Sequence, residues 1–241
     1  MSMRLLVSVQ SASEAEMAVR AGVDLIDVKD TTQGSLGAAT EQTIRSIFEV
    51  VANRTPVSVA AGEWIDSPAQ TDWQHTIERL PIAWIKWGPS GLGHSAELAP
   101  PHPRLPKSTQ APSTPPRSVA VAYADWQRAN APCPQWLQQF AIDQQFRVVL
   151  VDTWGKDGST LFDWFAPAEL ASWMQPLQDA GIAIALAGSL RWEMLPTLRS
   201  LRPDWIAVRG AVCHSANRND GLDPQRLRDW VDAVHAKEPP K

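Results

Sequence analysis

The sequence is poor in cysteine and has no long apolar run, and both absences narrow the class of protein. Only two cysteines occur among 241 residues, Cys133 and Cys213, and they lie far apart without the spacing of metal ligands. No apolar stretch reaches the length that spans a membrane, and the N-terminal MSMRLLVSVQ lacks the core of a signal peptide. We therefore expect a cytoplasmic protein with no membrane partner.

Clustered positive charge and several familiar enzyme motifs are also missing. The formal net charge is −4, which argues against a nucleic-acid partner, because phosphate backbones require clustered Lys and Arg. No GxGxxG, P-loop, GxSxG or HExxH motif occurs. The five histidines are scattered, so the sequence predicts no metal site.

Short apolar runs alternate with helical patterns along the chain. Strands are predicted at residues 4–9, 25–30, 57–62, 84–88, 118–124, 148–154, 182–188 and 205–211. Helices are predicted at 11–22, 40–53, 68–80, 134–144, 167–180, 190–201 and 223–236, the first capped by Ser13 and ended by Gly22. Because strands that alternate with helices pair in parallel, this pattern predicts one (β/α)₈ barrel domain over residues 1–241.

One interval interrupts the alternation after the fourth strand. Residues 99–117 read APPHPRLPKSTQAPSTPPR, which contains too many prolines for a helix interior. A linker between two domains is one interpretation, but the strand–helix alternation resumes directly afterwards. We therefore expect an irregular surface loop within the barrel. The Trp-rich helix faces are compatible with contacts in a homo-oligomer and equally with core packing, and the sequence leaves both open.

The stretch LIDVKD places two charges inside a predicted strand. Asp27 and Lys29 are two residues apart and share one face of the strand, while Ile26 and Val28 share the other. If the apolar pair packs against helices, the charged pair faces the barrel interior. A structural ion pair is the simplest explanation for one such pair.

Further charges follow other predicted strands. Lys86 lies near the end of the fourth strand, Asp152 ends the sixth, and Lys156 follows it in DTWGKDG. Active sites of (β/α)₈ proteins form at these carboxyl ends. Burying several like charges is costly unless they are paired, which favours a function over a structural role. A crowded, desolvated lysine loses its proton near neutral pH and can attack a carbonyl as an amine, and its neighbours can shuttle protons.

The ends of the seventh and eighth predicted strands contain glycines. Gly188 and Ser189 occur in LAGSL, and Arg209 and Gly210 occur in VRGA. Barrels often bind phosphate with the loops after these two strands, through backbone N–H groups. We therefore predict a phosphorylated ligand held by these four residues.

The motifs LIDVKDTTQGSLGA, WIKWG, VLVDTWGKDG, LAGSL and DWIAVRGAVC together resemble the (5-formylfuran-3-yl)methyl phosphate synthase family over nearly the whole chain. This resemblance implies a (β/α)₈ enzyme of methanofuran biosynthesis, a carbon–oxygen lyase that joins two glyceraldehyde 3-phosphates into 4-(hydroxymethyl)-2-furancarboxaldehyde phosphate with loss of phosphate and water. It implies a Schiff base on Lys29, Lys86 as proton acceptor, and assistance from Asp152 and Lys156. It implies no redox cofactor or metal. Asp27 is a further catalytic candidate.

Two other functions remain open from the residues. Another Schiff-base aldolase would share Lys29 and differ in its product. A non-catalytic barrel that binds phosphorylated metabolites would keep the fold without forming an imine, although the presence of all the charged residues above argues against it.

Overall fold

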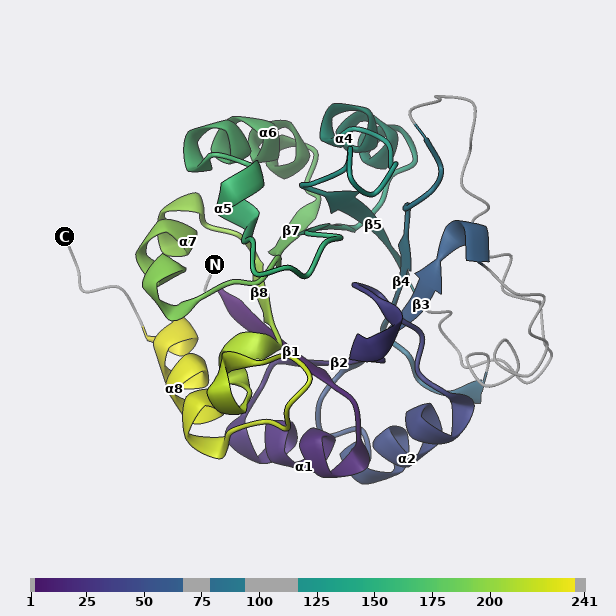
Figure 1. Cartoon of the computed structure of the whole chain (residues 1–241), viewed down its shortest axis with the longest axis vertical. Helices are drawn as coiled ribbons and strands as arrows, with labels where there is room; N and C mark the ends of the chain where they lie inside the picture. The colour runs from purple at the N-terminus through teal and green to yellow at the C-terminus, as the bar shows by residue number, and fades with distance from the viewer. Residues whose placement is uncertain (1–2, 67–78, 94–116, 237–241) are drawn as a thin grey trace.

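The eight strands of the computed structural model close into one parallel barrel, with helices on its outside (Figure 1). The structure describes residues 3–66, 79–93 and 117–236. The strands are β1 (Arg4–Val9), β2 (Leu25–Val28), β3 (Val57–Glu63), β4 (Trp84–Gly88), β5 (Arg117–Tyr123), β6 (Val148–Asp152), β7 (Ala183–Leu186) and β8 (Trp205–Val208). Each strand pairs in parallel with the next, and β8 pairs with β1. The predicted (β/α)₈ fold is confirmed.

The α-helices follow the strands as the alternation predicts. They are α1 (Ala12–Ala21), α2 (Glu41–Val51), α4 (Pro134–Asp143), α5 (Leu161–Trp164), α6 (Pro167–Asp179), α7 (Leu195–Leu201) and α8 (Pro224–His235). Short 3₁₀ turns are η1 (Thr31–Gln33), η2 (Trp64–Asp66), η3 (Trp192–Met194), η4 (Gly210–Val212) and η5 (His214–Ala216). Within the described ranges, none of these helices combines the length and apolarity needed to cross a bilayer.

The first helix is capped two residues earlier than predicted. The Ser11 hydroxyl, not Ser13, accepts the Glu14 backbone N–H at 3.3 Å, because Ser11 is the last residue with extended backbone. Gly22 ends the helix in the left-handed conformation at φ 82, as predicted.

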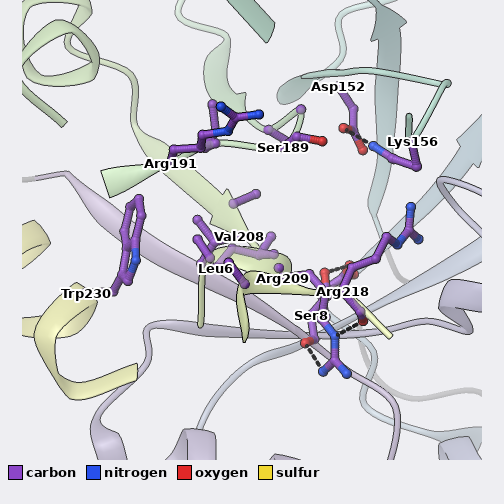
Figure 2. Close-up of a pocket in the computed structure, with 18 of the residues that line it drawn as sticks. Leu6, Ser8, Asp152, Lys156, Ser189, Arg191, Val208, Arg209, Arg218 and Trp230 are labelled. Atoms are coloured by element: carbon purple, nitrogen blue, oxygen red, sulfur yellow. Dashed lines mark hydrogen bonds and ion pairs between the residues drawn. The ribbon is translucent and has the colours of Figure 1, made fainter. Parts of the chain in front are cut away.

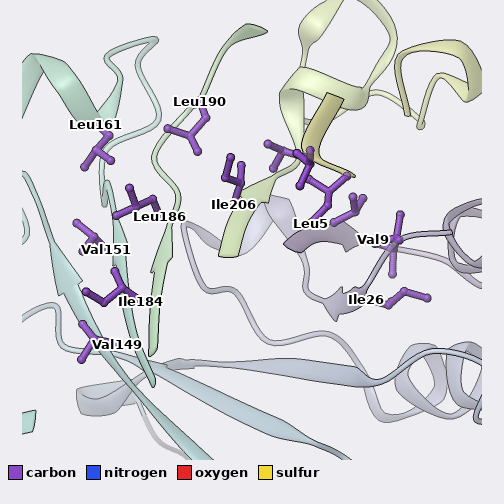
Figure 3. Packing of buried hydrophobic residues seen from close by; sticks show 14 of the residues in the cluster. Leu5, Val9, Ile26, Val149, Val151, Leu161, Ile184, Leu186, Leu190 and Ile206 are labelled. Atoms are coloured by element: carbon purple, nitrogen blue, oxygen red, sulfur yellow. The ribbon is translucent and has the colours of Figure 1, made fainter. Parts of the chain in front are cut away.

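Alternating strand residues build two apolar layers. Leu5, Val7 and Val9 of β1 point outward into the layer between strands and helices, where Figure 3 shows Leu5 and Val9 near Ile26. Leu6 of the same strand belongs to the cluster inside the barrel. Because β2 obeys the same alternation, Ile26 and Val28 face the helices and leave Asp27 for the interior.

Several strands end earlier than predicted. The pairing of β1 with β2 stops at Val9 and Val28, so Lys29 is the first residue of the following loop. Likewise β7 ends at Leu186 and β8 at Val208, where the chain turns toward short 3₁₀ segments. The predicted helix over 68–80 and the Pro-rich loop over 99–117 lie outside the described residues except at their last positions, of which Arg117 begins β5.

Candidate active site

A cavity of about 740 Å³ opens at the carboxyl ends of the strands. Its wall contains all five charged residues predicted at the strand ends, which are Asp27, Lys29, Lys86, Asp152 and Lys156. The predicted convergence of three lysines and two aspartates is therefore confirmed. Figure 2 shows Asp152 and Lys156 next to each other in the wall of this cavity, with Ser189 closer to them than Arg191.

Asp27 on β2 and Lys86 on β4 form a buried ion pair inside the barrel, past the intervening strand β3. Lys86 Nζ lies 2.5 Å from Asp27 Oδ1, and both side chains are almost fully buried. Asp27 also accepts hydrogen bonds from the Ser58 hydroxyl at 2.7 Å and the Ser8 hydroxyl at 3.1 Å. These serines stand beside Asp27 in the strand register. The carboxylate is thus fixed in position by three donors.

Asp152 and Lys156 form a second pair above the end of β6. Lys156 Nζ lies 2.9 Å from Asp152 Oδ1, which also accepts the Thr153 backbone N–H at 2.8 Å. Burial alone would raise the pKa of Asp152, but the charges of Lys156 and Lys29 outweigh it and hold that pKa below its usual value. Asp152 is therefore ionised at neutral pH.

Of the three lysines that line the cavity, Lys29 is the one without a carboxylate partner among the described residues. It is buried, and its Nζ donates to the Ser35 backbone carbonyl at 3.4 Å, with no ion pair to any carboxylate of the described ranges. Burial lowers its pKa to about 7, with Asp152 and Asp27 opposing the shift and Lys156 adding to it. Near neutral pH a large fraction of Lys29 is therefore a free amine.

Ser35 connects Lys29 to the second ion pair. Its backbone carbonyl accepts from Lys29, and its hydroxyl lies within hydrogen-bond distance of Asp152 Oδ2 at 3.0 Å and the Thr153 carbonyl at 2.9 Å. The loop after β2 thereby reaches the end of β6 and holds Lys29 next to Asp152.

The loops after β7 and β8 present free backbone N–H groups to the cavity. Gly188 and Ser189 both have positive φ, 98 and 49, which turns the chain sharply after β7. The N–H groups of Gly188, Ser189 and Gly210 donate to no acceptor among the residues that the structure describes. All three residues line the cavity. Backbone N–H groups without an acceptor can bind an anion by hydrogen bonds.

Arg209 lines the cavity but its guanidinium is used within the protein. Its Nε and Nη atoms donate to both carboxylate oxygens of Glu14 and to the backbone carbonyls of Ser8, Arg218 and Asp220. These contacts use all five N–H donors of an arginine. The prediction that this guanidinium contacts a phosphate is therefore wrong in this structure: Arg209 ties the loop after β8 to β1 and α1.

Two residues that the sequence analysis did not single out belong to the site. Asp125, directly after β5, accepts the backbone N–H groups of Trp154 and Gly155 at 2.6 and 2.8 Å and so shapes the loop that carries Lys156. The rule that strand ends carry function could have identified it. Arg218 lines the cavity from the loop after β8, where no sequence pattern marks it.

Comparisons with known proteins show which family this chain belongs to. The family model for 4-HFC-P synthase matches residues 5–231. The (5-formylfuran-3-yl)methyl phosphate synthase of Methanopyrus kandleri is 34% identical, covering 90% of this chain and 92% of that protein. The enzyme of the same name from Methanocaldococcus jannaschii is 33% identical, covering 93% of this chain and 96% of that protein.

Solved structures support the fold alone. The (S)-3-O-geranylgeranylglyceryl phosphate synthase from Thermoplasma acidophilum superposes with a TM-score of 0.59 at 14% identity, over 97% of this chain and 93% of that one. Phosphoribosyl anthranilate isomerase from Thermus thermophilus gives 0.58 at 15% identity, over 96% and 98%. The match of the family model and the identity to its curated relatives, each over most of the chain, show that this protein belongs to the 4-HFC-P synthase family.

Proposed function

We propose that this protein is a lyase that condenses two glyceraldehyde 3-phosphate molecules into 4-(hydroxymethyl)-2-furancarboxaldehyde phosphate through a Schiff base on Lys29, as an early step of methanofuran biosynthesis. This proposal rests on a difference in charge pairing among the three lysines that line the cavity. Lys86 and Lys156 are each paired with an aspartate, whereas Lys29 has no carboxylate partner within the described ranges and a pKa lowered to about 7. Only an unprotonated amine attacks a carbonyl.

The reaction begins when Lys29 Nζ attacks the carbonyl carbon of one triose phosphate and water leaves. The protonated imine acidifies the adjacent C–H bond, and loss of that proton gives an enamine. The enamine carbon then attacks the aldehyde carbon of the second triose phosphate. Hydrolysis of the imine then releases Lys29 from the six-carbon product. Elimination of phosphate and water from that product leads to the aromatic furan, whose stability drives these steps without an oxidant.

Two ion pairs flank Lys29 and are suited to the proton transfers. The Asp27–Lys86 pair lies 2.5 Å apart inside the barrel, so a proton can move between them with little rearrangement. The Asp152–Lys156 pair lies on the Ser35 side of Lys29. We assign proton abstraction to Lys86 with Asp27, and protonation of the leaving hydroxyl groups to Lys156 with Asp152.

The phosphate of the first substrate is assigned to the backbone N–H groups of Gly188, Ser189 and Gly210. Their free donors and positive φ angles after β7 support this assignment. Arg209 contributes by holding the loop after β8 rather than by contact with the phosphate.

Borohydride reduction in the presence of glyceraldehyde 3-phosphate, followed by peptide mass spectrometry, tests the proposal. The expected result is an adduct on the peptide that contains Lys29, together with furan absorbance when borohydride is omitted. An adduct without a furan product would favour another Schiff-base aldolase. A folded protein that forms neither, with the substrate intact, would contradict the proposal and favour a non-catalytic binding protein.

Lys29→Arg is the matched variant for this experiment. Arginine keeps the positive charge but stays protonated and forms no imine, so the adduct and the furan should both disappear. Circular dichroism checks that the variant is folded. Substantial residual turnover in folded Lys29→Arg would overturn the role of Lys29.

A further inference from the structure

Arg218 places an incompletely bonded guanidinium in the wall of the cavity. One of its terminal nitrogens donates to the Gly34 carbonyl at 2.8 Å, which anchors the side chain to the loop after β2. Its Nε is buried yet has no hydrogen-bond acceptor among the residues that the structure describes. A buried N–H donor without a partner is rare in proteins, so the protein itself leaves this guanidinium incompletely satisfied.

The carboxylates near Lys29 form ion pairs with lysines and not with Arg218. Lys86 is paired with Asp27, and Lys156 with Asp152. Arg218 has no ion pair with a carboxylate of the described ranges, and its charge acts on both Lys29 and Asp152. Arginine remains protonated at all physiological pH values, so Arg218 is a permanent cation beside the reacting amine.

Arg209 shows that this chain can satisfy an arginine completely when its role is structural. Arg209 comes from the same loop region and uses all five of its N–H donors within the protein. Arg218, which also lines the cavity, donates through only one terminal nitrogen to a residue that the structure describes. In Figure 2 its side chain extends toward the side where Lys156 and Asp152 lie, away from Arg191.

We propose that Arg218 binds the phosphate group of the second triose phosphate, the molecule that the enamine attacks. This inference rests on the proposed function and adds a second anion position to it. The first phosphate occupies the backbone N–H groups after β7 and β8, and the second lies against the guanidinium beside Lys29. A planar guanidinium matches two phosphate oxygens with parallel N–H donors. Two such positions in the wall of the cavity that contains Lys29 hold both triose phosphates near the reactive amine.

The first test is calorimetric titration with inorganic phosphate, which requires no activity. Wild-type protein should bind two phosphates, whereas Arg218→Gln should lose one site or weaken it at least tenfold. Arg228→Gln on the exposed face of α8 is the matched control and should titrate like wild type, since Arg228 is not among the cavity residues and its one side-chain hydrogen bond within the described ranges is to Gln225. Identical titrations of Arg218→Gln and wild type would overturn the inference.

The second test separates the two substrate molecules kinetically. Arg218→Gln should still form the borohydride-trapped adduct on Lys29 at low substrate, while half-saturation of furan formation moves to at least tenfold higher glyceraldehyde 3-phosphate. An unchanged half-saturation would contradict the inference. If wild-type protein forms no adduct and no furan, the proposed function fails instead, and the phosphate titration still decides whether Arg218 is an anion site.

Arg218→Lys covers the case in which the glutamine variant does not fold. Lysine keeps the charge but presents a single ammonium group, so it cannot offer two parallel donors. Phosphate binding at the second site should weaken less than in Arg218→Gln but remain below wild type. Wild-type affinity in a folded Arg218→Lys variant would mean that the paired donors of the guanidinium are not used.

Discussion

Asp27 pairs with Lys86 on β4 at 2.5 Å, and not with Lys29, which follows it by two residues in the chain. The charges of Asp27 and Lys86 thereby compensate each other. Lys29 remains without a carboxylate partner in the described ranges, and burial lowers its pKa. In the proposed mechanism, this pairing distinguishes Lys86, a proton carrier, from Lys29, the nucleophile, although both lysines line the same cavity.

The pH dependence of imine formation should report the lowered pKa of Lys29. Because burial lowers that pKa to about 7, the trapping rate at limiting substrate should rise as pH increases through about 7 and then level off. An unperturbed lysine would give a rise near pH 10. The rate of borohydride trapping, measured at fixed times between pH 5.5 and 9, gives this pH profile. A rate that keeps rising to pH 9 without a plateau would contradict a pKa of about 7 for Lys29.

Burial of Lys29 should also cost stability, and the cost should depend on pH. The folded-state pKa lies below the unfolded value, so the unfolded chain binds more protons between about pH 7 and 10.5. The penalty is therefore complete below about pH 7 and declines as pH rises toward the unfolded pKa.

Lys29→Met should accordingly be more stable than wild type at pH 7, by on the order of a few kcal/mol, because it removes the buried amine. This advantage should shrink as pH is raised toward 10. Urea unfolding at pH 6.5, 8 and 9.5 measures both proteins. A difference that stays constant with pH would show that Lys29 is not the group responsible.

The Asp27–Lys86 pair should behave as a coupled unit in a double-mutant cycle. Asp27→Asn leaves the Lys86 ammonium buried without its carboxylate, and Lys86→Met leaves Asp27 with two serine donors only. Each single variant should lose about 3–5 kcal/mol of unfolding free energy.

The double variant Asp27→Asn/Lys86→Met should lose clearly less than the sum of the two single variants. It removes both charges, so neither is left uncompensated in the interior. Denaturant unfolding of all four proteins gives the coupling energy. Additive losses would mean that the two side chains act independently in spite of their contact.

Asp125 should position Lys156 without touching the substrate. Its two oxygens accept the N–H groups of Trp154 and Gly155, the two residues that directly precede Lys156. Asp125→Asn replaces one acceptor by a donor, so we expect a loss of about 2–3 kcal/mol in stability and a lower kcat.

The control for that variant is Asp143→Asn at the exposed end of α4. Asp143 accepts one side-chain hydrogen bond within the part of the chain that the structure describes, from Gln139, so this variant should keep stability and kcat close to wild type. A positioning role predicts that the KM for glyceraldehyde 3-phosphate changes little in Asp125→Asn while kcat falls. A wild-type kcat in a destabilised Asp125→Asn protein would leave Asp125 with a structural role only.

Much of this arrangement was predictable from the sequence. The alternation of apolar runs with helical patterns indicated the barrel, because each parallel pair needs a helical crossover. The two-residue period of LIDVKD placed Asp27 on the interior face, since its apolar neighbours pack against helices. Strand-end positions likewise predicted that Lys86, Asp152 and Lys156 would meet in one cavity.

Which of these charged residues form ion pairs was decided by the tertiary structure alone. Whether Asp27 binds Lys29 or Lys86 depends on distances between strands and on side-chain directions, which residue spacing does not specify. Residue spacing likewise does not predict that Arg209 pairs with Glu14, which lies 195 positions away in the chain. That pairing occupies the guanidinium of Arg209, so it is not free to bind phosphate. Arg218 lies in a loop whose sequence has no periodic pattern, so the sequence does not place it in the cavity. Its Nε lacks a hydrogen bond because the residues packed around it bury it without offering an acceptor. Local periodicity dictates which face a side chain occupies, but pairing and desolvation depend on every neighbour in space.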